Sequence, residues 1–233
     1  MDKAALVSAV ICAAGSSSRM GGIKKEYQKL RNSEADITVL GSVVRAFASV
    51  PSVEIIVIAI PENEEAAARE ALPGEYLNVQ KPKILLVAGG QSRSASVFNA
   101  LCVLENYDTR YVLIHDGARP WVSTPLIENI IDAVKKHDAV IPLLPPTETP
   151  KELDAPLSEQ AFITRHLKRA NTGFAQTPQG FKFTEILHAH EKAAQVKDEE
   201  FTDDAEVWGR FCGPVAVIPG EIENKKITFQ EDL

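Results

Sequence analysis

The stretch ALVSAVICAAGSSSRMGG, residues 5–22, decides the fold, because an apolar run passes directly into a loop of glycine and serine. The run is nearly continuous in apolar residues, which is typical of a strand buried on both faces of a parallel sheet. A loop that leaves the carboxyl end of such a strand is where open α/β sheets bind ligands. We therefore predict a first parallel strand followed by a ligand-binding loop.

Similar apolar runs recur along the chain, namely VEIIVIAI, PKILLVAGG, YVLIHD, DAVIPLLP and PVAVIPG. Helical patterns lie between them. One helix follows Ser92, with Ser92 or Ser94 as its N-cap, and another has Thr124 as N-cap and Pro125 at its first helical position. ENEEAAAREAL is a third helical segment, with acidic residues in its first turn. This alternation of strands and helices predicts a three-layer α/β fold with a mostly parallel sheet.

One segment departs from the alternation. Residues from Pro145 to about Thr177 are polar, contain the proline-rich PPTETP, and lack a strong core pattern. No repeat or low-complexity linker divides the chain elsewhere. We expect a single domain, residues 1–233, with an arm-like excursion at about 145–177 that takes the form of a hairpin.

Composition limits the classes of function. The net charge of −7 argues against a general nucleic-acid binder, and no run approaches a membrane span. The apolar residues 4–14 lack the basic lead-in of a signal peptide. Three widely spaced cysteines, Cys12, Cys102 and Cys212, form no zinc pattern and fit a reducing compartment. We expect a cytoplasmic protein with no nucleic-acid or membrane partner.

The N-terminal loop matches neither of two familiar phosphate motifs. Met20 breaks the Walker pattern, and Ser17 breaks the G-x-G-x-x-G pattern of dinucleotide-binding proteins. The loop region is nevertheless basic. Between Ser16 and Arg31 the acidic chain places five cations against Glu26 alone: Arg19, Lys24, Lys25, Lys29 and Arg31. This local charge favours a polyphosphate site over a simple surface turn.

Further motifs follow other apolar runs. In YVLIHDGARP, Asp116 and Arg119 stand just past a buried strand, where they form a surface ion pair or meet a metal-bound phosphate or a sugar hydroxyl. GGQSRSASV is a second glycine-rich junction, either a ligand site or simple helix capping. FTDDAEVW reads as a helix start at Thr202 or Asp203. The histidines show no metal spacing.

Together these pieces resemble the methylerythritol phosphate cytidylyltransferase family of isoprenoid synthesis. The matching motifs, in the family's order from about Ala9 to Leu233, are AAGSSSRMG, KKEY, GGQSRSASV, HDGARP, TETPK, TPQGF, TDDA and ENKKIT. The resemblance implies a Rossmann-like nucleotidyltransferase fold, CTP and a sugar-alcohol phosphate as substrates, and Mg²⁺. It also implies a homodimer whose projecting dimerisation arms complete the partner's sites.

The resemblance implies a role for each matching residue. The catalytic cations are Arg19, Lys25 and Lys226. The CTP-binding residues are Ala13, Ala14, Gly15, Gly90, Ser96 and Asp116. The residues that bind the sugar-alcohol phosphate are Asp116, Arg119, Thr149, Arg169 and Thr177. Magnesium is held mainly through the CTP phosphates, with Asp116 as a further possible ligand.

This set of residues suits the chemistry. A phosphate monoester is largely dianionic near neutral pH and needs no general base to attack the α-phosphorus of CTP. The remaining task is to bring two anions together and to stabilise the leaving pyrophosphate, which cations perform. Two departures from the family occur in KKEY, where Lys24 replaces a proline and Glu26 a glutamine. Register with Tyr27 favours Lys25 as the catalytic lysine, with Lys24 as the alternative.

Three other functions compete with this reading. A ribitol-5-phosphate cytidylyltransferase shares much of the pattern, and Lys151 and Arg169 favour the methylerythritol enzyme by resemblance. A non-catalytic nucleotide-binding regulator would keep the fold, but the expected cations are all present. A dinucleotide-binding oxidoreductase is disfavoured by the broken glycine motif.

Overall fold

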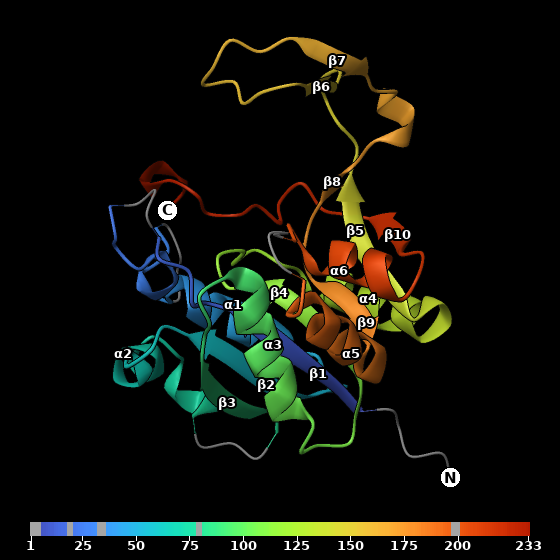
Figure 1. Ribbon diagram of the computed structural model, residues 1–233. Helices are drawn as coiled ribbons and strands as arrows, with labels where there is room; N and C mark the ends of the chain where they lie inside the picture. Colours follow the sequence, from blue (N-terminus) through green and yellow to red (C-terminus); the bar gives the residue numbers. More distant parts are fainter. Residues whose placement is uncertain (1–5, 18–20, 32–35, 78–80, 197–200) are drawn as a thin grey trace.

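A computed structural model describes residues 6–17, 21–31, 36–77, 81–196 and 201–233. Its central feature is a mixed sheet (Figure 1). The strands are β1 (Leu6–Cys12), β2 (Val53–Ile60), β3 (Lys83–Ala88), β4 (Thr109–Asp116), β5 (Ala139–Leu144), β8 (Phe174–Ala175), β9 (Gln179–Lys182) and β10 (Ala216–Pro219). Their order is β10-β5-β9-β4-β1-β2-β3, and the short β8 pairs with β5.

The sheet is mostly parallel, as predicted. β1 pairs in parallel with both β2 and β4, and parallel pairing also joins β2 to β3 and β10 to β5. The exceptions come from the segment that follows β5. β8 runs antiparallel to β5, and β9 inserts antiparallel between β4 and β5. The carboxyl ends of β1, β3 and β4 therefore lie along one edge, where the site is found.

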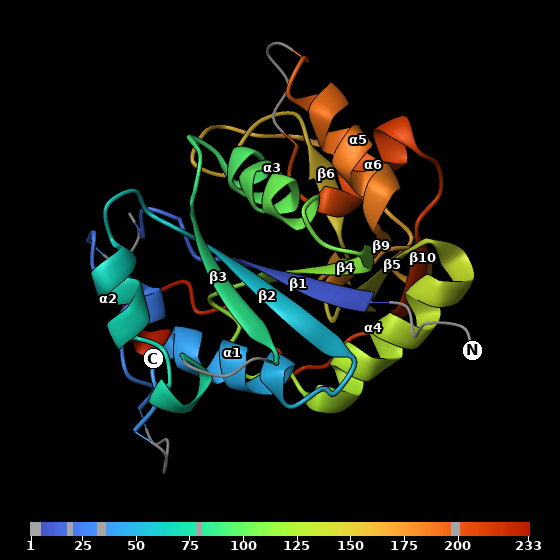
Figure 2. The same cartoon turned by 90° about the horizontal axis from the view of Figure 1, so that it is seen from below.

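Helices cover both faces of the sheet, and Figure 2 shows the resulting layers. The helices are α1 (Val39–Ala48), α2 (Glu65–Glu70), α3 (Arg93–Leu104), α4 (Thr124–His137), α5 (Phe183–Ala193) and α6 (Asp204–Phe211). One core cluster joins the sheet to α1 and α4, and a second joins it to α3, α5 and α6. The predicted three-layer α/β fold is confirmed.

Alternate side chains of the central strands enter opposite layers. In β2, Ile56 and Ile58 pack toward α1 and α4, whereas Ile55 and Val57 pack toward α3. A strand covered on both faces has no polar side, which explains the continuous apolar runs of the sequence. Each buried aliphatic side chain of this size contributes about 1.5–3 kcal/mol to folding.

Short polar residues define where the helices begin. Ser92, rather than Ser94, caps α3, and Asp203 caps α6. The prediction that Thr124 caps α4 was wrong by one residue. Ser123 is the cap, because its backbone is extended while Thr124 is already helical, and Pro125 takes the second helical position.

The segment after β5 leaves the sheet and projects from the body of the protein as a hairpin (Figure 1). Its antiparallel strands are β6 (Lys151–Leu153) and β7 (Ile163–His166). The hairpin exposes large apolar side chains, including Leu157, which is 87% exposed, and Phe162, which is 63% exposed. The chain then returns to the sheet through β8.

Candidate active site

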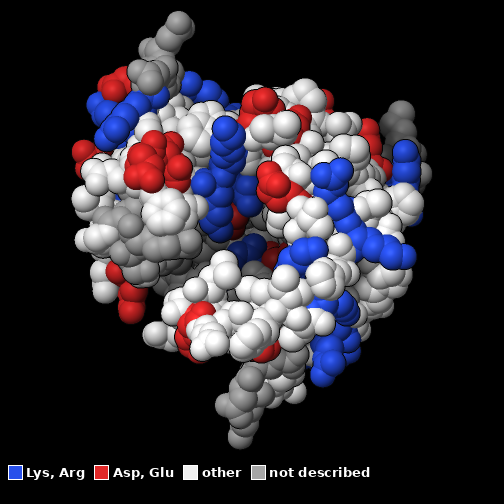
Figure 3. Space-filling model, turned by 90° about the horizontal axis from the view of Figure 1, so that it is seen from above, with Lys and Arg blue, Asp and Glu red and all other residues white. Residues whose placement is uncertain are grey.

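A cleft of about 500 Å³ opens at the carboxyl ends of β1, β3 and β4. It is built from four segments far apart in sequence: the loop after β1, the loop before α3, the end of β4, and the C-terminal segment that crosses over them. Figure 3 shows the hollow on this face with Lys and Arg side chains around it. An acidic chain thus concentrates cations where its parallel strands end.

The loop after β1 supplies one wall of the cleft through Gly15, Ser16 and Ser17. Lys25 also lines the cleft, and its Nζ donates to the carbonyl oxygen of Ile227 at 2.9 Å. The neighbouring Lys24 instead donates to the carbonyl oxygen of Gly15 at 2.6 Å, and burial lowers its pKa. The two lysines therefore differ: Lys25 faces the cleft, and Lys24 supports the loop behind it.

The loop before α3 forms the opposite wall. The Gly90 amide donates to Ser96 Oγ at 3.0 Å, and that hydroxyl donates to the carbonyl oxygen of Ser92 at 2.9 Å. A side chain at Gly90 would place its Cβ 2.5 Å from the Cβ of Ala95. Close packing of the loop on α3 therefore requires glycine at position 90, and it leaves the backbone accessible to a ligand.

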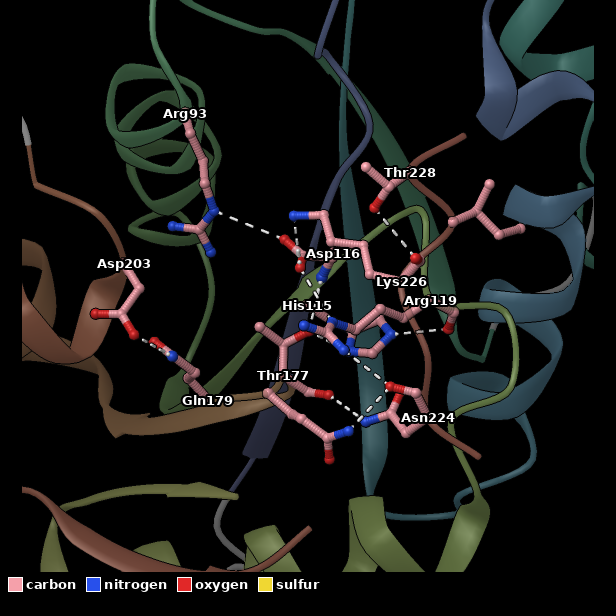
Figure 4. A network of polar contacts seen from close by, with 12 residues as sticks. Arg93, His115, Asp116, Arg119, Thr177, Gln179, Asp203, Asn224, Lys226 and Thr228 are labelled. Atoms are coloured by element: carbon pink, nitrogen blue, oxygen red, sulfur yellow. Dashed lines mark hydrogen bonds and ion pairs between the residues drawn. The ribbon is translucent and has the colours of Figure 1, made fainter. Parts of the chain in front are cut away.

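Asp116, at the end of β4, is the centre of the site (Figure 4). Its carboxylate lies 3.0 Å from Lys226 Nζ, 3.2 Å from Arg119 Nε and 3.7 Å from Arg93 Nε. Burial alone would raise the pKa of Asp116, but the three cations outweigh burial and hold this pKa well below its usual range. Asp116 is therefore a permanent anion that gathers positive charge at the cleft.

The backbone behind Asp116 is fixed by Thr177 and His115. Thr177 Oγ1 accepts from the Asp116 amide at 3.1 Å and lies 2.9 Å from His115 Nδ1. His115 Nε2 faces the carbonyl oxygen of Arg119 at 3.2 Å and must donate to it, so Nδ1 of the neutral ring accepts from the Thr177 hydroxyl. Burial lowers the pKa of His115 to about 4, so the ring is neutral and serves as a structural link.

A second buried network, which the sequence analysis missed, holds Arg93. Arg93 Nη2 lies 2.7 Å from Asp204 Oδ2, and His190 Nε2 lies 3.2 Å from Asp204 Oδ1. Burial would raise the pKa of Asp204, but Arg93 and His190 outweigh it and bring the pKa to about 2. Arg93 stands within GGQSRSASV, which was interpreted as either a ligand site or helix capping, and Asp204 stands within TDDA, which was interpreted as a helix start; neither side chain was singled out.

The other predicted residues lie in three different settings. Ala14, like Gly15, lines the cleft, whereas Ala13 is fully buried beneath it and its amide donates to the carbonyl oxygen of Ala59. Thr149 and Arg169 are exposed on the hairpin segment, outside the cleft lining. Arg19 lies outside the described residues.

Two features of the described residues bear on metal and membrane binding. Among the described residues, no three His, Cys, Asp or Glu side chains are grouped so that they could hold a metal ion by themselves. None of the described helices is both long and apolar enough to cross a membrane.

Comparison with protein families gives one match over nearly the whole chain. Residues 7–233 match the model for 2-C-methyl-D-erythritol 4-phosphate cytidylyltransferase. The enzyme of that name from Pelotomaculum thermopropionicum is 37% identical over 234 residues, which cover all of this chain and 92% of the relative.

Other relatives carry a second activity in their names. The bifunctional enzyme IspD/IspF of Bartonella henselae is 34% identical over 227 residues, covering 97% of this chain and 55% of that enzyme. The chain thus spans about half the length of the bifunctional relatives that it matches.

A solved structure shares the fold. The 4-diphosphocytidyl-2C-methyl-D-erythritol synthase of Anaerococcus prevotii superposes with a TM-score of 0.83 at 29% identity, over 98% of this chain and 93% of that one.

Proposed function

Because this chain belongs to the 2-C-methyl-D-erythritol 4-phosphate cytidylyltransferase family, we propose that it transfers the cytidylyl group of CTP to 2-C-methyl-D-erythritol 4-phosphate. The products are 4-diphosphocytidyl-2-C-methyl-D-erythritol and pyrophosphate. The observation that carries the proposal is the Asp116 carboxylate with Arg93, Arg119 and Lys226 around it at the edge of the cleft. This charge arrangement suits two anionic substrates, and the family membership specifies which ones.

The reaction is an in-line displacement at phosphorus. An oxygen of the sugar-alcohol phosphate attacks the α-phosphorus of CTP, and the bond from that phosphorus to the oxygen bridging to the β-phosphate breaks. The attacking phosphate is already ionised near neutral pH, so no base is needed. This agrees with the described residues, where the buried His115 is neutral and engaged at both ring nitrogens.

Preorganised cations provide the catalysis in this proposal. Lys25 and Lys226 line the cleft from two segments far apart in sequence, so their ammonium groups are in place before charge develops on the leaving pyrophosphate. Arg19, expected to grip the same phosphates, shares this role in the proposal. Asp116 balances Lys226 and Arg93, and it is the carboxylate placed to accept from a ribose hydroxyl.

For CTP itself, we assign the phosphate groups to the loop after β1, with Ala14 and Gly15 at its start, and the cytosine to Gly90 and Ser96. Ser96 fixes the Gly90 amide rather than turning its own hydroxyl freely toward the cleft. A buried Ala13 supports the loop from below.

We further propose Mg²⁺ as the divalent cofactor. The donor set fits, because Mg²⁺ prefers oxygen ligands and is commonly held by one or two carboxylates together with substrate phosphates. Asp116 would provide a carboxylate oxygen, and the CTP phosphates would provide the others. When bound, the ion would neutralise charge on the leaving group.

The hairpin segment is proposed as the arm, at about 145–177, of a single domain that spans residues 1–233 and forms a homodimer. Its exposed Leu157 and Phe162 suit burial against a second copy. Thr149 and Arg169, which lie outside the cleft lining of their own chain, would then contact the sugar-alcohol phosphate in the partner's site. We also propose a cytoplasmic location, which the three free cysteines support.

The experiment measures pyrophosphate release from the purified protein with CTP, Mg²⁺ and 2-C-methyl-D-erythritol 4-phosphate, with ribitol 5-phosphate in a parallel reaction. Release only with the methylerythritol substrate supports the proposal. Preference for ribitol 5-phosphate would replace the substrate while keeping the chemistry. CTP binding by folded protein without any pyrophosphate release would instead support a non-catalytic regulator.

A further inference from the structure

Two buried amide side chains, Gln176 and Asn224, tie the C-terminal segment to the sheet just before it delivers Lys226 to the cleft. We propose that this pair, the amide clamp, positions Lys226 for catalysis. The inference rests on the proposed function, in which the Lys226 ammonium meets the reacting phosphates. The amide clamp touches no substrate in this proposal and acts through the backbone that carries Lys226.

Gln176 holds the beginning of the segment. Its Oε1 accepts from the Glu221 amide at 3.0 Å, and its Nε2 donates to the carbonyl oxygen of Glu221 at 2.8 Å. The same Nε2 lies 3.1 Å from the carbonyl oxygen of Asn224. A side chain at Gly220 would clash with Gln176, since its Cβ would lie 2.4 Å from Oε1. The segment is thus fitted closely onto one buried amide.

Asn224 connects this segment to residues of the site (Figure 4). Its Nδ2 donates to the carbonyl oxygen of Thr177 at 2.8 Å, and its own carbonyl oxygen accepts from Arg119 Nη1 at 2.8 Å. Asn224 is fully buried. Thr177 and Arg119 are both bonded to Asp116, so Asn224 places the segment relative to the same carboxylate that Lys226 approaches.

Lys226 lies between two fixed points of the backbone. Asn224 precedes it by two residues, and the amide of Ile227 donates to the carbonyl oxygen of Ala118 at 2.8 Å. The Lys226 side chain is 39% exposed, and its ammonium group lies 3.0 Å from Asp116 Oδ2. The ion pair with Asp116 holds the ammonium group only if the Cα of Lys226 stays within reach of that carboxylate. A displacement of about 1 Å in a catalytic group can cost about 100-fold in rate.

The test uses the full chain with Asn224→Ala and Gln176→Ala, each of which removes one half of the amide clamp. Turnover should fall at least ~10-fold in each variant. The CTP Kd measured by calorimetry should rise no more than about threefold, because Lys226 is one of several proposed contacts to CTP and the two nucleotide loops are untouched. The matched control is Glu221→Ala, which removes a side-chain bond to Ser123 from the same segment and leaves the amide clamp intact. Its turnover should equal that of the wild type.

A double-mutant cycle with Lys226→Ala separates positioning from general damage. If Asn224 acts through Lys226, then Asn224→Ala should lower turnover little further once Lys226 is gone. Full additivity of the two losses, or wild-type turnover in both clamp variants, would overturn the proposal.

Limited trypsin digestion supplies a readout that needs no activity. The backbone after Lys225 and Lys226 should be cut at least ~10-fold faster in Asn224→Ala and Gln176→Ala than in wild type and Glu221→Ala, because cleavage follows local opening. Equal cutting rates would show that the clamp does not hold the segment. Faster cutting of the clamp variants than of a wild-type protein that releases no pyrophosphate would mean that the proposed function failed while the clamp itself exists.

Discussion

The ammonium group of Lys226 lies 3.0 Å from Oδ2 of Asp116, although one residue ends a central strand and the other stands in the C-terminal segment. Arg119 and Arg93 approach the same carboxylate. Three cations around one buried anion leave an excess of positive charge beside the cleft. Such an arrangement holds the cations in place without fully neutralising them, which is what the binding of two anionic substrates requires.

Lys226→Ala should lower turnover by about 100-fold, the scale of losing one preorganised charge partner. The fold should survive, since Asp116 keeps Arg93 and Arg119 as partners. Steady-state kinetics and thermal unfolding measure the two effects. The matched control is Lys225→Ala, which changes the exposed neighbour on the same segment and should leave turnover unchanged. Equal turnover in the two variants would remove Lys226 from the mechanism.

Lys25→Ala should also lower turnover by at least ~100-fold, because Lys25 lines the cleft beside the loop to which we assign the CTP phosphates. Lys29→Ala is its control: Lys29 is exposed, pairs with Asp36 on the surface, and should be dispensable. Single-turnover kinetics with saturating CTP isolates the chemical step. Near-normal turnover for Lys25→Ala, with a large loss for Lys24→Ala, would transfer the catalytic role to Lys24.

His115 should make the protein less stable on mild acidification. Its pKa is about 4 in the folded protein, below the ordinary value of about 6.5. Between these values the unfolded chain takes up a proton that the folded protein refuses, so the contribution is complete above pH ~6.5 and falls as the pH drops toward ~4. The total loss is about 3 kcal/mol. The free energy of unfolding, measured with urea at several pH values from 7 to 4, should fall less with decreasing pH in His115→Asn than in the wild type. An identical pH dependence in the two proteins would contradict this assignment.

Mixing two inactive variants tests whether the arm completes the partner's site. Lys25→Ala disables the cleft, and Arg169→Ala disables the arm. If each site combines one chain's cleft with the other chain's arm, exchange between equal amounts of the two variants should restore about a quarter of the wild-type activity. Half of the dimers are then mixed, and one of the two sites in each mixed dimer is intact. Arg169→Ala mixed with itself is the baseline. Absence of any recovery in dimers shown by mass to be mixed would place Arg169 outside the partner's site.

Removal of divalent metal should abolish pyrophosphate release. The described residues offer Asp116 but no cluster of ligands, so the metal would be held largely by the CTP phosphates and a chelator should remove it. EDTA should stop the reaction, and excess Mg²⁺ should restore it. CTP binding measured in EDTA should weaken without disappearing, because Lys25 and Lys226 still face the phosphates. Full turnover in the presence of EDTA would exclude a metal requirement.

Much of the fold could be predicted from local sequence patterns, namely apolar runs and helix-capping residues. The continuous apolar runs at Leu6–Cys12 and Val53–Ile60 are strands buried on both faces, and the predicted layers follow from the helices between them. The predicted N-cap of α4 was wrong by one residue, because Ser123 and Thr124 are both residue types that commonly cap helices. Only the backbone, extended at Ser123 and helical at Thr124, distinguishes them.

Part of the cleft lining was named from the sequence. Gly15, Gly90, Ser96, Asp116 and Lys226 stand within quoted motifs and line the cleft, and their roles there stay predictions. Arg93, Asp204 and Asn224 were missed, because their importance lies in contacts with residues far away in sequence.

By itself the sequence determined the six apolar strands of the sheet, several of the helices between them and the basic loop after the first strand, because apolar periodicity and local charge act over a few neighbouring residues. It did not indicate β9, which inserts antiparallel between β4 and β5, or the helices α1 and α5. The tertiary structure alone decided which of two adjacent lysines faces the cleft, and that Asp116 gathers cations from three separate segments. The physical reason is the sheet order. It brings the ends of β1, β3 and β4 to one edge, and buried amides at Gln176 and Asn224 then fix the C-terminal segment across them.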